Sequence, residues 1–396
     1  MKRLIILLTT LLLLICVLPS CSSTKTGSKE SVPGLFENNL LPVMLDDKWG
    51  YIDKNGKYVI NPQFERAYPF SEGLAVVVVD NQYGYIDKTG TYVINPQFQY
   101  ASEFSNGLAK VRVDGKWGYI NDRGQYVIDP QFDYVDSFYS DLATVMLGEK
   151  FGYIDKKGQY VINPQFDVAD DFHEGLAAVK TGEKYGYIDK TGKYVINPQF
   201  SNTYPFVNGI ALVQSGDQYG YIDKSGSYVI NPQYDRALSF ENGLAMVYIN
   251  DAWGIINEKG EYVVNPQFDG IRPFHEDVAW VQFGNYTGFI NKKGEYVINP
   301  QEKHIISAFC NGLAAAYDED GGAYSLCGFI DLTGEFVINP QFDSVSMFFS
   351  DGYALVKVNN KIGIINKEGK YVVNPQFDAV YTNSSYFHEF NEFMYY

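Results

Sequence analysis

Residues 49–64 read WGYIDKNGKYVINPQF, and versions of this stretch occur ten times along a chain of 396 residues. The glycine at its second position returns at residues 84, 118, 152, 186, 220, 254, 288, 328 and 363. Seven of these intervals are 34 residues long, and the last two are 40 and 35 residues. Such a fixed period indicates a solenoid, a propeller or another array, in which each unit must pack on its neighbours to bury a core.

Each repeat contains three segments that are typical of β-strands. In the second copy they are residues 74–79, which are rich in β-branched side chains, residues 83–87 and residues 92–94. A short fourth segment at residues 98–101 is a further candidate strand. The repeat therefore predicts a small antiparallel meander.

Two kinds of residue mark the turns of the meander. Asp87 and Gly90 favour a type I turn followed by a glycine of positive φ, which joins the second and third strands in a hairpin. Ten of the 16 prolines follow the third strand, as Pro96 does. Because proline cannot donate to a strand ladder, we expect it to end that strand.

Comparison of the copies predicts which faces are buried. In the first strand Ala75 and Val77 recur almost unchanged, whereas the interleaved positions vary and hold Lys110, Arg112, Gln214, Tyr248, Trp280 and Gln282 in other copies. This alternation favours one packed face and one exposed face. The second and third strands are apolar on both faces, which predicts stacked sheets. We expect Tyr51, Tyr58, Phe64 and their copies to be core, and Gly50 to admit a neighbouring sheet or ring.

The predicted fold class is all-β, with ten tandem antiparallel meanders of about 34 residues in a β-propeller-like ring. The points within the repeat unit at which the array begins and ends favour a closed ring. The repeats begin near Phe36, just before a first strand, and end with the fourth segment of the tenth copy at residues 377–380. The two ends can thus complete one shared blade. An open superhelical β-stack remains the alternative, since ten units exceed the usual four to eight blades.

The N-terminus predicts an export signal and a lipid anchor. Lys2 and Arg3 precede an apolar run, Leu4–Leu18, that is short for a membrane span. The run ends at Cys21 in a sequence that resembles a bacterial lipobox, which implies lipidation of Cys21. An ordinary secretory signal is the alternative. We therefore expect a signal peptide at 1–20, a lipidated cysteine and flexible tether at 21–34, and the repeat domain at 35–396.

The composition limits the class of partner. With 31 basic and 47 acidic residues, the formal net charge is −16, and no basic cluster follows the first three residues. Nucleic acid is not expected as a partner, because its binding requires basic patches. At 46% hydrophobic residues, the chain is too apolar for a disordered acidic tail.

The repeats resemble those of the WG-repeat family of bacterial envelope proteins, which is named for a Trp-Gly pair. The pair itself is present at Trp49-Gly50, Trp117-Gly118 and Trp253-Gly254. Four copies keep another aromatic before the glycine: Tyr83, Phe151, Tyr185 and Tyr219. Thr287, Cys327 and Ile362 depart from the pattern. The resemblance covers residues 36–387 and implies an extracytoplasmic repeat protein, but it brings no catalytic residue.

No residue pattern predicts catalysis, a cofactor or a metal site. His173 and His275 occupy the same position of two repeats, as expected of an exposed loop, and the acidic stretch 318–322 is best explained as a hairpin tip. Cys310 and Cys327 are an even pair in an oxidising compartment. If Leu313 faces Tyr324 in a hairpin, the cysteines lie opposite each other and form a disulfide. Two buried free thiols are the alternative.

A repeated scaffold with one variable face favours a binding function. We predict a non-catalytic interaction protein, anchored to the membrane and outside the cytoplasm, whose partner is an envelope protein or a glycan. A glycan- or cell-wall-binding module is the more specific alternative, and a propeller-fold hydrolase or lyase is a third. The candidate contacts are Trp280, at the position held by Val76 and Lys110 in other copies, with Tyr248 and Tyr317 beside it.

Overall fold

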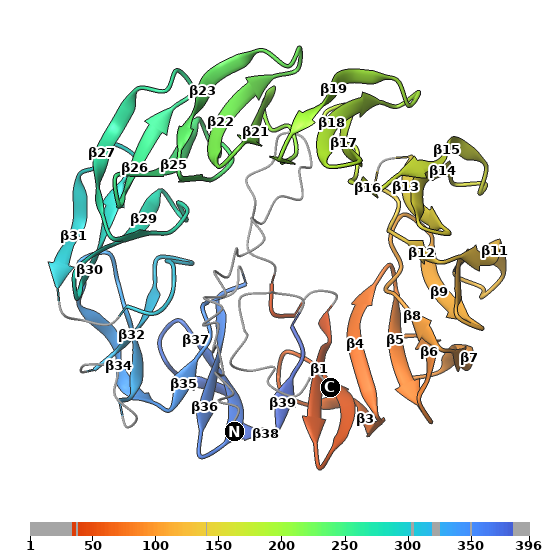
Figure 1. Cartoon of the computed structure of the whole chain (residues 1–396). Coiled ribbons are helices and arrows are strands. Elements are labelled where there is room, and N and C mark those ends of the chain that lie inside the picture. Colours follow the sequence, from red (N-terminus) through yellow and green to blue (C-terminus); the bar gives the residue numbers. More distant parts are fainter. Residues whose placement is uncertain are drawn as a thin grey trace, which may run out of the picture.

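The computed structural model describes residues 34–36, 39–139, 141–301, 305–318, 325–348 and 351–382. These residues form a ring of ten antiparallel sheets (Figure 1), nine with four strands and one with three. The prediction of an all-β repeat array is confirmed. None of the described residues forms a helix that is long and apolar enough to cross a membrane. The predicted signal peptide and nearly all of the predicted tether lie outside the described residues.

The strands fall into four sets by their place in the sheet, numbered from the centre of the ring outward. The innermost strands are β4 (Arg66–Ser71), β8 (Tyr100–Ala101), β12 (Tyr134–Val135), β16 (Val168–Ala169), β20 (Asn202–Thr203), β24 (Arg236–Ala237), β28 (Gly270–Ile271), β35 (Ser344–Val345) and β39 (Ala379–Val380). The second strands are β1 (Leu41–Leu45), β5 (Leu74–Val79), β9 (Ala109–Val113), β13 (Leu142–Leu147), β17 (Leu176–Thr181), β21 (Ile210–Ser215), β25 (Leu244–Ile249), β29 (Val278–Phe283), β32 (Ala314–Tyr317) and β36 (Tyr353–Val358). The third strands are β2 (Lys48–Ile52), β6 (Gln82–Ile86), β10 (Lys116–Ile120), β14 (Lys150–Asp155), β18 (Lys184–Asp189), β22 (Gln218–Asp223), β26 (Ala252–Asn257), β30 (Tyr286–Asn291), β33 (Cys327–Ile330) and β37 (Lys361–Asn366). The outermost strands are β3 (Tyr58–Phe64), β7 (Tyr92–Phe98), β11 (Tyr126–Phe132), β15 (Tyr160–Phe166), β19 (Tyr194–Phe200), β23 (Tyr228–Tyr234), β27 (Tyr262–Phe268), β31 (Tyr296–Gln301), β34 (Phe336–Phe342) and β38 (Tyr371–Phe377).

Each sheet is one blade, and the blades are numbered here in chain order. Blade 1 consists of β39, β1, β2 and β3, and blade 2 of β4–β7; blades 3 to 8 follow with four strands each. Blade 9 contains β32–β34, and an isolated bridge between Ile305 and Ala316 takes the place of its innermost strand. Blade 10 consists of β35–β38.

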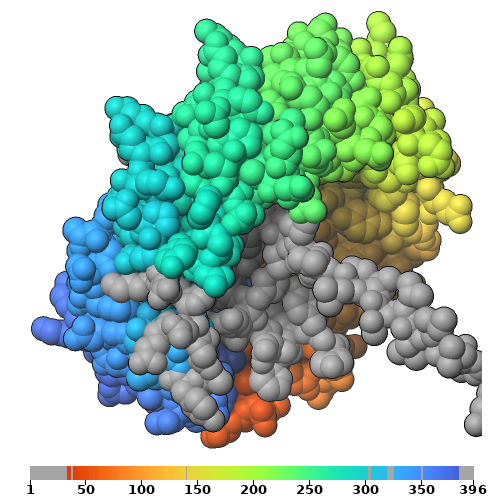
Figure 2. Space-filling model, turned by 60° about the vertical axis from the view of Figure 1, so that its left-hand side comes forward, coloured from red at the N-terminus to blue at the C-terminus, as the bar shows by residue number. Residues whose placement is uncertain are grey.

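The two ends of the chain close the ring in blade 1. Strand β39 pairs with β1, with Val380 opposite Val43. The Asp351 carboxylate of blade 10 accepts hydrogen bonds from the backbone N–H groups of Leu35 and Phe36, at 3.0 Å each. The C-terminal blades therefore abut the N-terminal ones, as Figure 2 also shows for the blue and red ends. The closed ring is confirmed, and the open superhelical stack is not formed.

A bulge in the outermost strand explains the repeated glycine. Trp49 lies opposite Phe64 and Tyr51 opposite Ile60, so a step of two residues along β2 matches a step of four residues along β3. A Cβ on Gly50 would lie 2.5 Å from the carbonyl oxygen of Ile60, closer than a carbon can approach. The close neighbour is thus the backbone of the same blade, and the expectation of a neighbouring sheet or ring was wrong.

The same bulge corrects the expected end of the third strand. Strand β7 continues through Pro96 to Phe98, because the irregular register falls where proline has no N–H to donate. The predicted turn is confirmed. Asp87 accepts the N–H groups of Thr89 and Thr91, and Gly90 has a φ of 87°.

The core lies between blades. Tyr51 and Phe64 are buried as predicted, but copies of Tyr58 such as Tyr92 are about 40% exposed on the outer rim. The predicted alternation in the second strand is wrong at the position of Val76. That position is buried in most copies, for example Leu212 and Leu355. The reason is that a blade lies between two others, so both faces of its second strand are covered.

Candidate functional site

Trp280 packs between blades instead of presenting a free face. Its ring is half-buried against the cluster that contains Val278, Ile305 and Ala316. The Arg272 guanidinium lies over the ring, 4.6 Å from the centroid. Trp280 is thus partly exposed and partly packed, because this position of the second strand faces the next blade.

Tyr248 and Tyr317 occupy a different position of their strands and have separate surroundings. Tyr248 is half-buried, with its ring 5.3 Å from that of Trp253 and with the Arg236 guanidinium 5.6 Å from its centroid. Tyr317 is also half-buried and packs against the cluster between blades 9 and 10. Trp280 belongs to the cluster between blades 8 and 9, so these three residues do not share one packing environment.

The register of blade 9 corrects the cysteine prediction. Cys327 lies opposite Tyr317, so the pairing on which the disulfide was predicted is wrong. Cys310 and Cys327 are both buried in the cluster between blades 9 and 10 and are not joined by a disulfide. Burial raises the pKa of the Cys310 thiol to about 12. The proposed lipidation residue, Cys21, lies outside the described residues.

A pocket on the inner side of blades 1 to 4 was not predicted from the sequence. Its volume is about 480 Å³, within the range of small-molecule sites. Segments from four successive blades line it, and the contribution of blade 1 is Tyr381, which directly follows β39. The lining comprises Tyr68, Ser71, Glu72, Val76, Tyr100, Ala101, Ser102, Glu103, Phe104, Ser105, Lys110, Ser137 and Tyr381.

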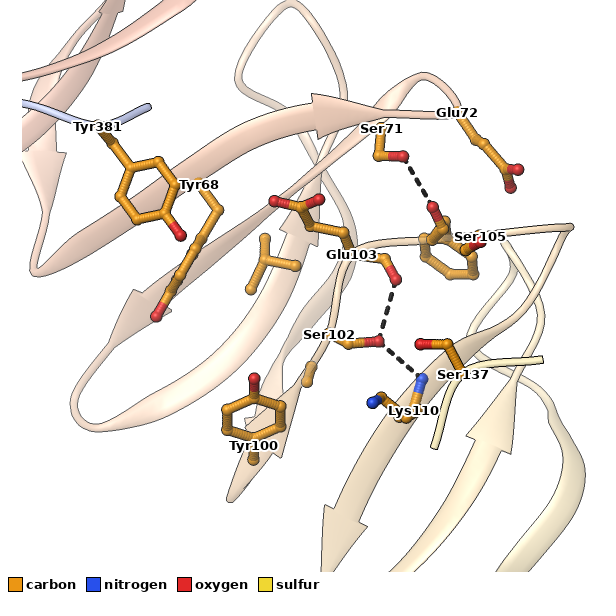
Figure 3. Close-up of a pocket in the computed structure, with 13 residues that line it drawn as sticks. Tyr68, Ser71, Glu72, Tyr100, Ser102, Glu103, Ser105, Lys110, Ser137 and Tyr381 are labelled. Carbon is orange, nitrogen blue, oxygen red and sulfur yellow. Dashed lines mark hydrogen bonds between the residues drawn. The ribbon is translucent and has the colours of Figure 1, made fainter. Parts of the chain in front are cut away.

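The pocket has an aromatic side and a hydroxyl-bearing side (Figure 3). Tyr381, Tyr68 and Tyr100 lie on one side, and Ser102 and Ser137 lie across from them. Innermost strands β4 and β8 position Tyr68 and Tyr100, while β39 ends next to Tyr381. The site thus depends on closure of the ring.

Hydrogen bonds hold the polar wall in place. Ser102 Oγ donates to the carbonyl oxygen of Glu103 at 3.0 Å and accepts the N–H of Lys110 at 3.0 Å. Ser71 Oγ donates to the carbonyl oxygen of Phe104 at 2.7 Å and so links blade 2 to blade 3. These contacts fix the positions of the hydroxyl oxygens.

The charged groups of the pocket are mostly engaged in the structure. Both carboxylate oxygens of Glu72 accept backbone N–H groups from the next blade, those of Asn106 at 2.8 Å and Gly107 at 2.9 Å. Lys110 forms an ion pair of 3.4 Å with Asp136. Beyond it lies Asp171, whose pKa is raised to about 6 by burial and by the negative charge of Asp136. Among the described residues, no group of three or more His, Cys, Asp and Glu is placed to hold a metal ion.

A row of aromatic rings extends from the pocket along blades 1 to 3. The ring centroids of Tyr381 and Tyr68 are 5.2 Å apart, and Tyr83 lies 6.5 Å from Tyr68 and 5.1 Å from Tyr100. Trp117 continues the row, 5.2 Å from Tyr100. We call this the aromatic row. Tyr100 is its most exposed member, with 40% of its surface accessible, whereas the other four are half-buried.

Sequence comparisons place the chain in a family. The WG containing repeat matches it ten times, at residues 49–83, 83–117, 117–151, 151–185, 185–219, 219–251, 253–286, 288–317, 328–361 and 362–385. The chain therefore belongs to the family of proteins built from the WG containing repeat. No curated protein matches its sequence.

Comparison with solved structures found similar chains. One is a eukaryotic initiation factor with a TM-score of 0.51 and 12% identity, covering 90% of this chain and 98% of the other. Another is PorZ, a surface component of the type-IX secretion system of Porphyromonas gingivalis, with a TM-score of 0.27 and 9% identity over 88% of this chain and 54% of that one. At 12% identity, the similarity to the initiation factor shows the fold alone.

Proposed function

We propose that this protein is a non-catalytic binding protein of the bacterial envelope, which takes its ligand in the pocket on the inner side of blades 1 to 4. The observation that carries the proposal is the composition of that pocket: three tyrosines and four serines line it, and hydrogen bonds hold the hydroxyl groups of Ser71 and Ser102. Pockets with aromatic walls and a few placed polar groups are typical ligand sites.

The engaged carboxylate of Glu72 favours binding over hydrolysis. Glu103 and Glu72 both line the pocket, and paired carboxylates can cleave glycosidic bonds when both face the bond. Here the two oxygens of Glu72 hold the backbone of the Asn106–Gly107 turn. We therefore propose that Glu72 joins blades and takes no part in proton transfer.

The location is proposed from the N-terminal sequence. The apolar run Leu4–Leu18 and the lipobox-like residues before Cys21 support export and lipid anchoring. Expression of the wild type and Cys21→Ser, followed by detergent partitioning and intact-mass measurement, tests the anchor. We expect a diacylglyceryl mass on the wild type alone; an unmodified wild-type chain would contradict it.

The binding function is tested with isolated envelope material. The mature chain is sedimented with membrane and cell-wall fractions over a range of concentrations, and the recovered envelope components are analysed by mass spectrometry. We expect saturable, reversible binding with the components unchanged in mass. No saturable binding to any fraction, or cleavage of a component, would overturn the proposal.

A further inference from the structure

The aromatic row offers ring faces with hydroxyl groups at their edges. Tyrosine presents an apolar ring and a polar tip, and such rings suit ligands that combine apolar patches with many hydroxyl groups. Three of the rings that line the pocket, Tyr68, Tyr100 and Tyr381, come from three different blades. The aromatic row continues beyond the pocket through Tyr83 and Trp117, so a chain of several sugar rings could contact more of it than a single small molecule could.

The opposite wall supplies neutral hydrogen-bonding groups. Ser71, Ser102, Ser105 and Ser137 all line the pocket, and a serine hydroxyl has one donor proton and an oxygen that accepts. Ser71 and Ser102 already donate their protons to backbone carbonyls, so toward a ligand their oxygens act as acceptors. A polyhydroxylated ligand matches this wall because its own hydroxyl groups can donate to these oxygens.

The charge around the pocket disfavours an anionic ligand. Its lysine, Lys110, is paired with Asp136, and the lining also contains the carboxylates Glu72 and Glu103. The whole chain carries a formal net charge of −16. A phosphorylated or uronic-acid polymer would be repelled, whereas a neutral polymer would not.

The strand edges at the pocket are unsuited to an extended peptide. Peptides commonly bind by adding a strand to a free sheet edge. Strands β8 and β12 have only two residues each. The pairing of β4 with β5 is interrupted at Pro69, which lies between the pairs Ala67–Val77 and Phe70–Ala75. Proline at an edge removes a donor that a peptide would need.

We infer that the pocket and the aromatic row bind a neutral oligosaccharide, whose sugar rings lie against Tyr68, Tyr100 and Tyr381 and whose hydroxyl groups contact the serine wall. This inference rests on the proposed binding function and names the ligand class of the same site.

The test is calorimetric titration of the mature chain with three neutral hexasaccharides, cellohexaose, maltohexaose and N-acetylchitohexaose. The variant is Tyr100→Ala, which removes an exposed ring of the pocket. The matched control is Tyr134→Ala, because Tyr134 occupies the same repeat position in blade 4, is 41% exposed and does not line the pocket.

We expect at least one hexasaccharide to bind, Tyr100→Ala to weaken its binding by about 10-fold or more, and Tyr134→Ala to leave it unchanged. Three results would overturn the inference: no binding of any hexasaccharide at millimolar concentration, equal weakening by both variants, or displacement of the bound envelope component by a basic peptide but by no sugar. If saturable envelope binding persists without sugar binding, the sugar assignment fails while the binding function stands.

Discussion

The phenolic hydroxyl of Tyr51 in blade 1 donates a hydrogen bond of 2.8 Å to the backbone carbonyl of Tyr68 in blade 2. The same contact, 17 residues apart, joins five further pairs of blades: Tyr85 with Ser102, Tyr119 with Asp136, Tyr153 with Asp170, Tyr187 with Tyr204, and Tyr221 with Leu238. The remaining four copies have Ile255, Phe289, Phe329 and Ile364 there, which have no hydroxyl group. The first six interfaces thus have a polar bond that the last four lack.

Tyr153→Phe should destabilise the ring by about 1 kcal/mol, since it leaves the carbonyl oxygen of Asp170 without this donor while the ring packing remains. Urea unfolding measures the change. The control is Tyr160→Phe, at a tyrosine that is 40% exposed on the outer rim, and it should have almost no effect. Equal effects of the two variants would show that the contact between blades contributes nothing.

Asp351→Ala should loosen the closure of the ring, because Asp351 holds the N–H groups of Leu35 and Phe36. Loss of two hydrogen bonds to a charged group should cost about 2 kcal/mol. Amide exchange should rise in β1 and β39. Glu72→Ala removes the equivalent contact between blades 2 and 3 and should leave exchange in β1 and β39 unchanged. Unchanged exchange in Asp351→Ala would refute the role in closure.

Asp171→Asn should stabilise the protein at neutral pH and do so less in acid. Burial and the charge of Asp136 raise the pKa of Asp171 to about 6 from an ordinary 3.8. Between these values the folded state binds a proton that the unfolded state does not, so this residue's contribution to stability increases as pH falls from 7 to 4. Denaturant unfolding at pH 7.5 and 4.5 measures the difference. Asp122→Asn, in an exposed turn, is the control; a gain from Asp171→Asn that is the same at both pH values would contradict the assignment.

Trp280→Ala should lower the free energy of unfolding by about 2 kcal/mol, because the ring packs with Ile305 and Ala316 and under Arg272. Phe283→Ala, on the same strand at 58% exposure, should change it by less than about 0.5 kcal/mol. Thermal unfolding compares the two. An unchanged melting temperature for Trp280→Ala would restore this residue as an exposed candidate contact.

The period of the repeat was enough to predict the architecture. Local signals such as Asp87 and Gly90 predicted the turns. The shared blade was predicted because the repeats begin near Phe36 without a fourth segment and end with one at residues 377–380. Closure followed because an incomplete first blade can bury its open edge only against the missing strand. These features depend on residues that are close in sequence or on the register of whole repeats.

The pocket could not be predicted because it depends on contacts between blades. Tyr68 and Tyr381 are more than 300 residues apart and meet only when the ring closes, with their ring centroids 5.2 Å apart. Comparison of repeats also predicted the wrong face for Val76, which is buried. Variation among copies does not by itself indicate exposure, because the space between two blades tolerates side chains of different size. A search for tyrosines near the ends of the innermost strands would have found Tyr68 and Tyr100.

The most direct test of the binding site is hydrogen–deuterium exchange of the mature chain with and without a saturating envelope fraction. The account predicts added protection in residues 68–76 and 100–110, which contain most of the residues that line the pocket, and little change in β25 and β29. Protection centred on β25 and β29, with none at the pocket, would contradict it and place the contacts near Tyr248 and Trp280.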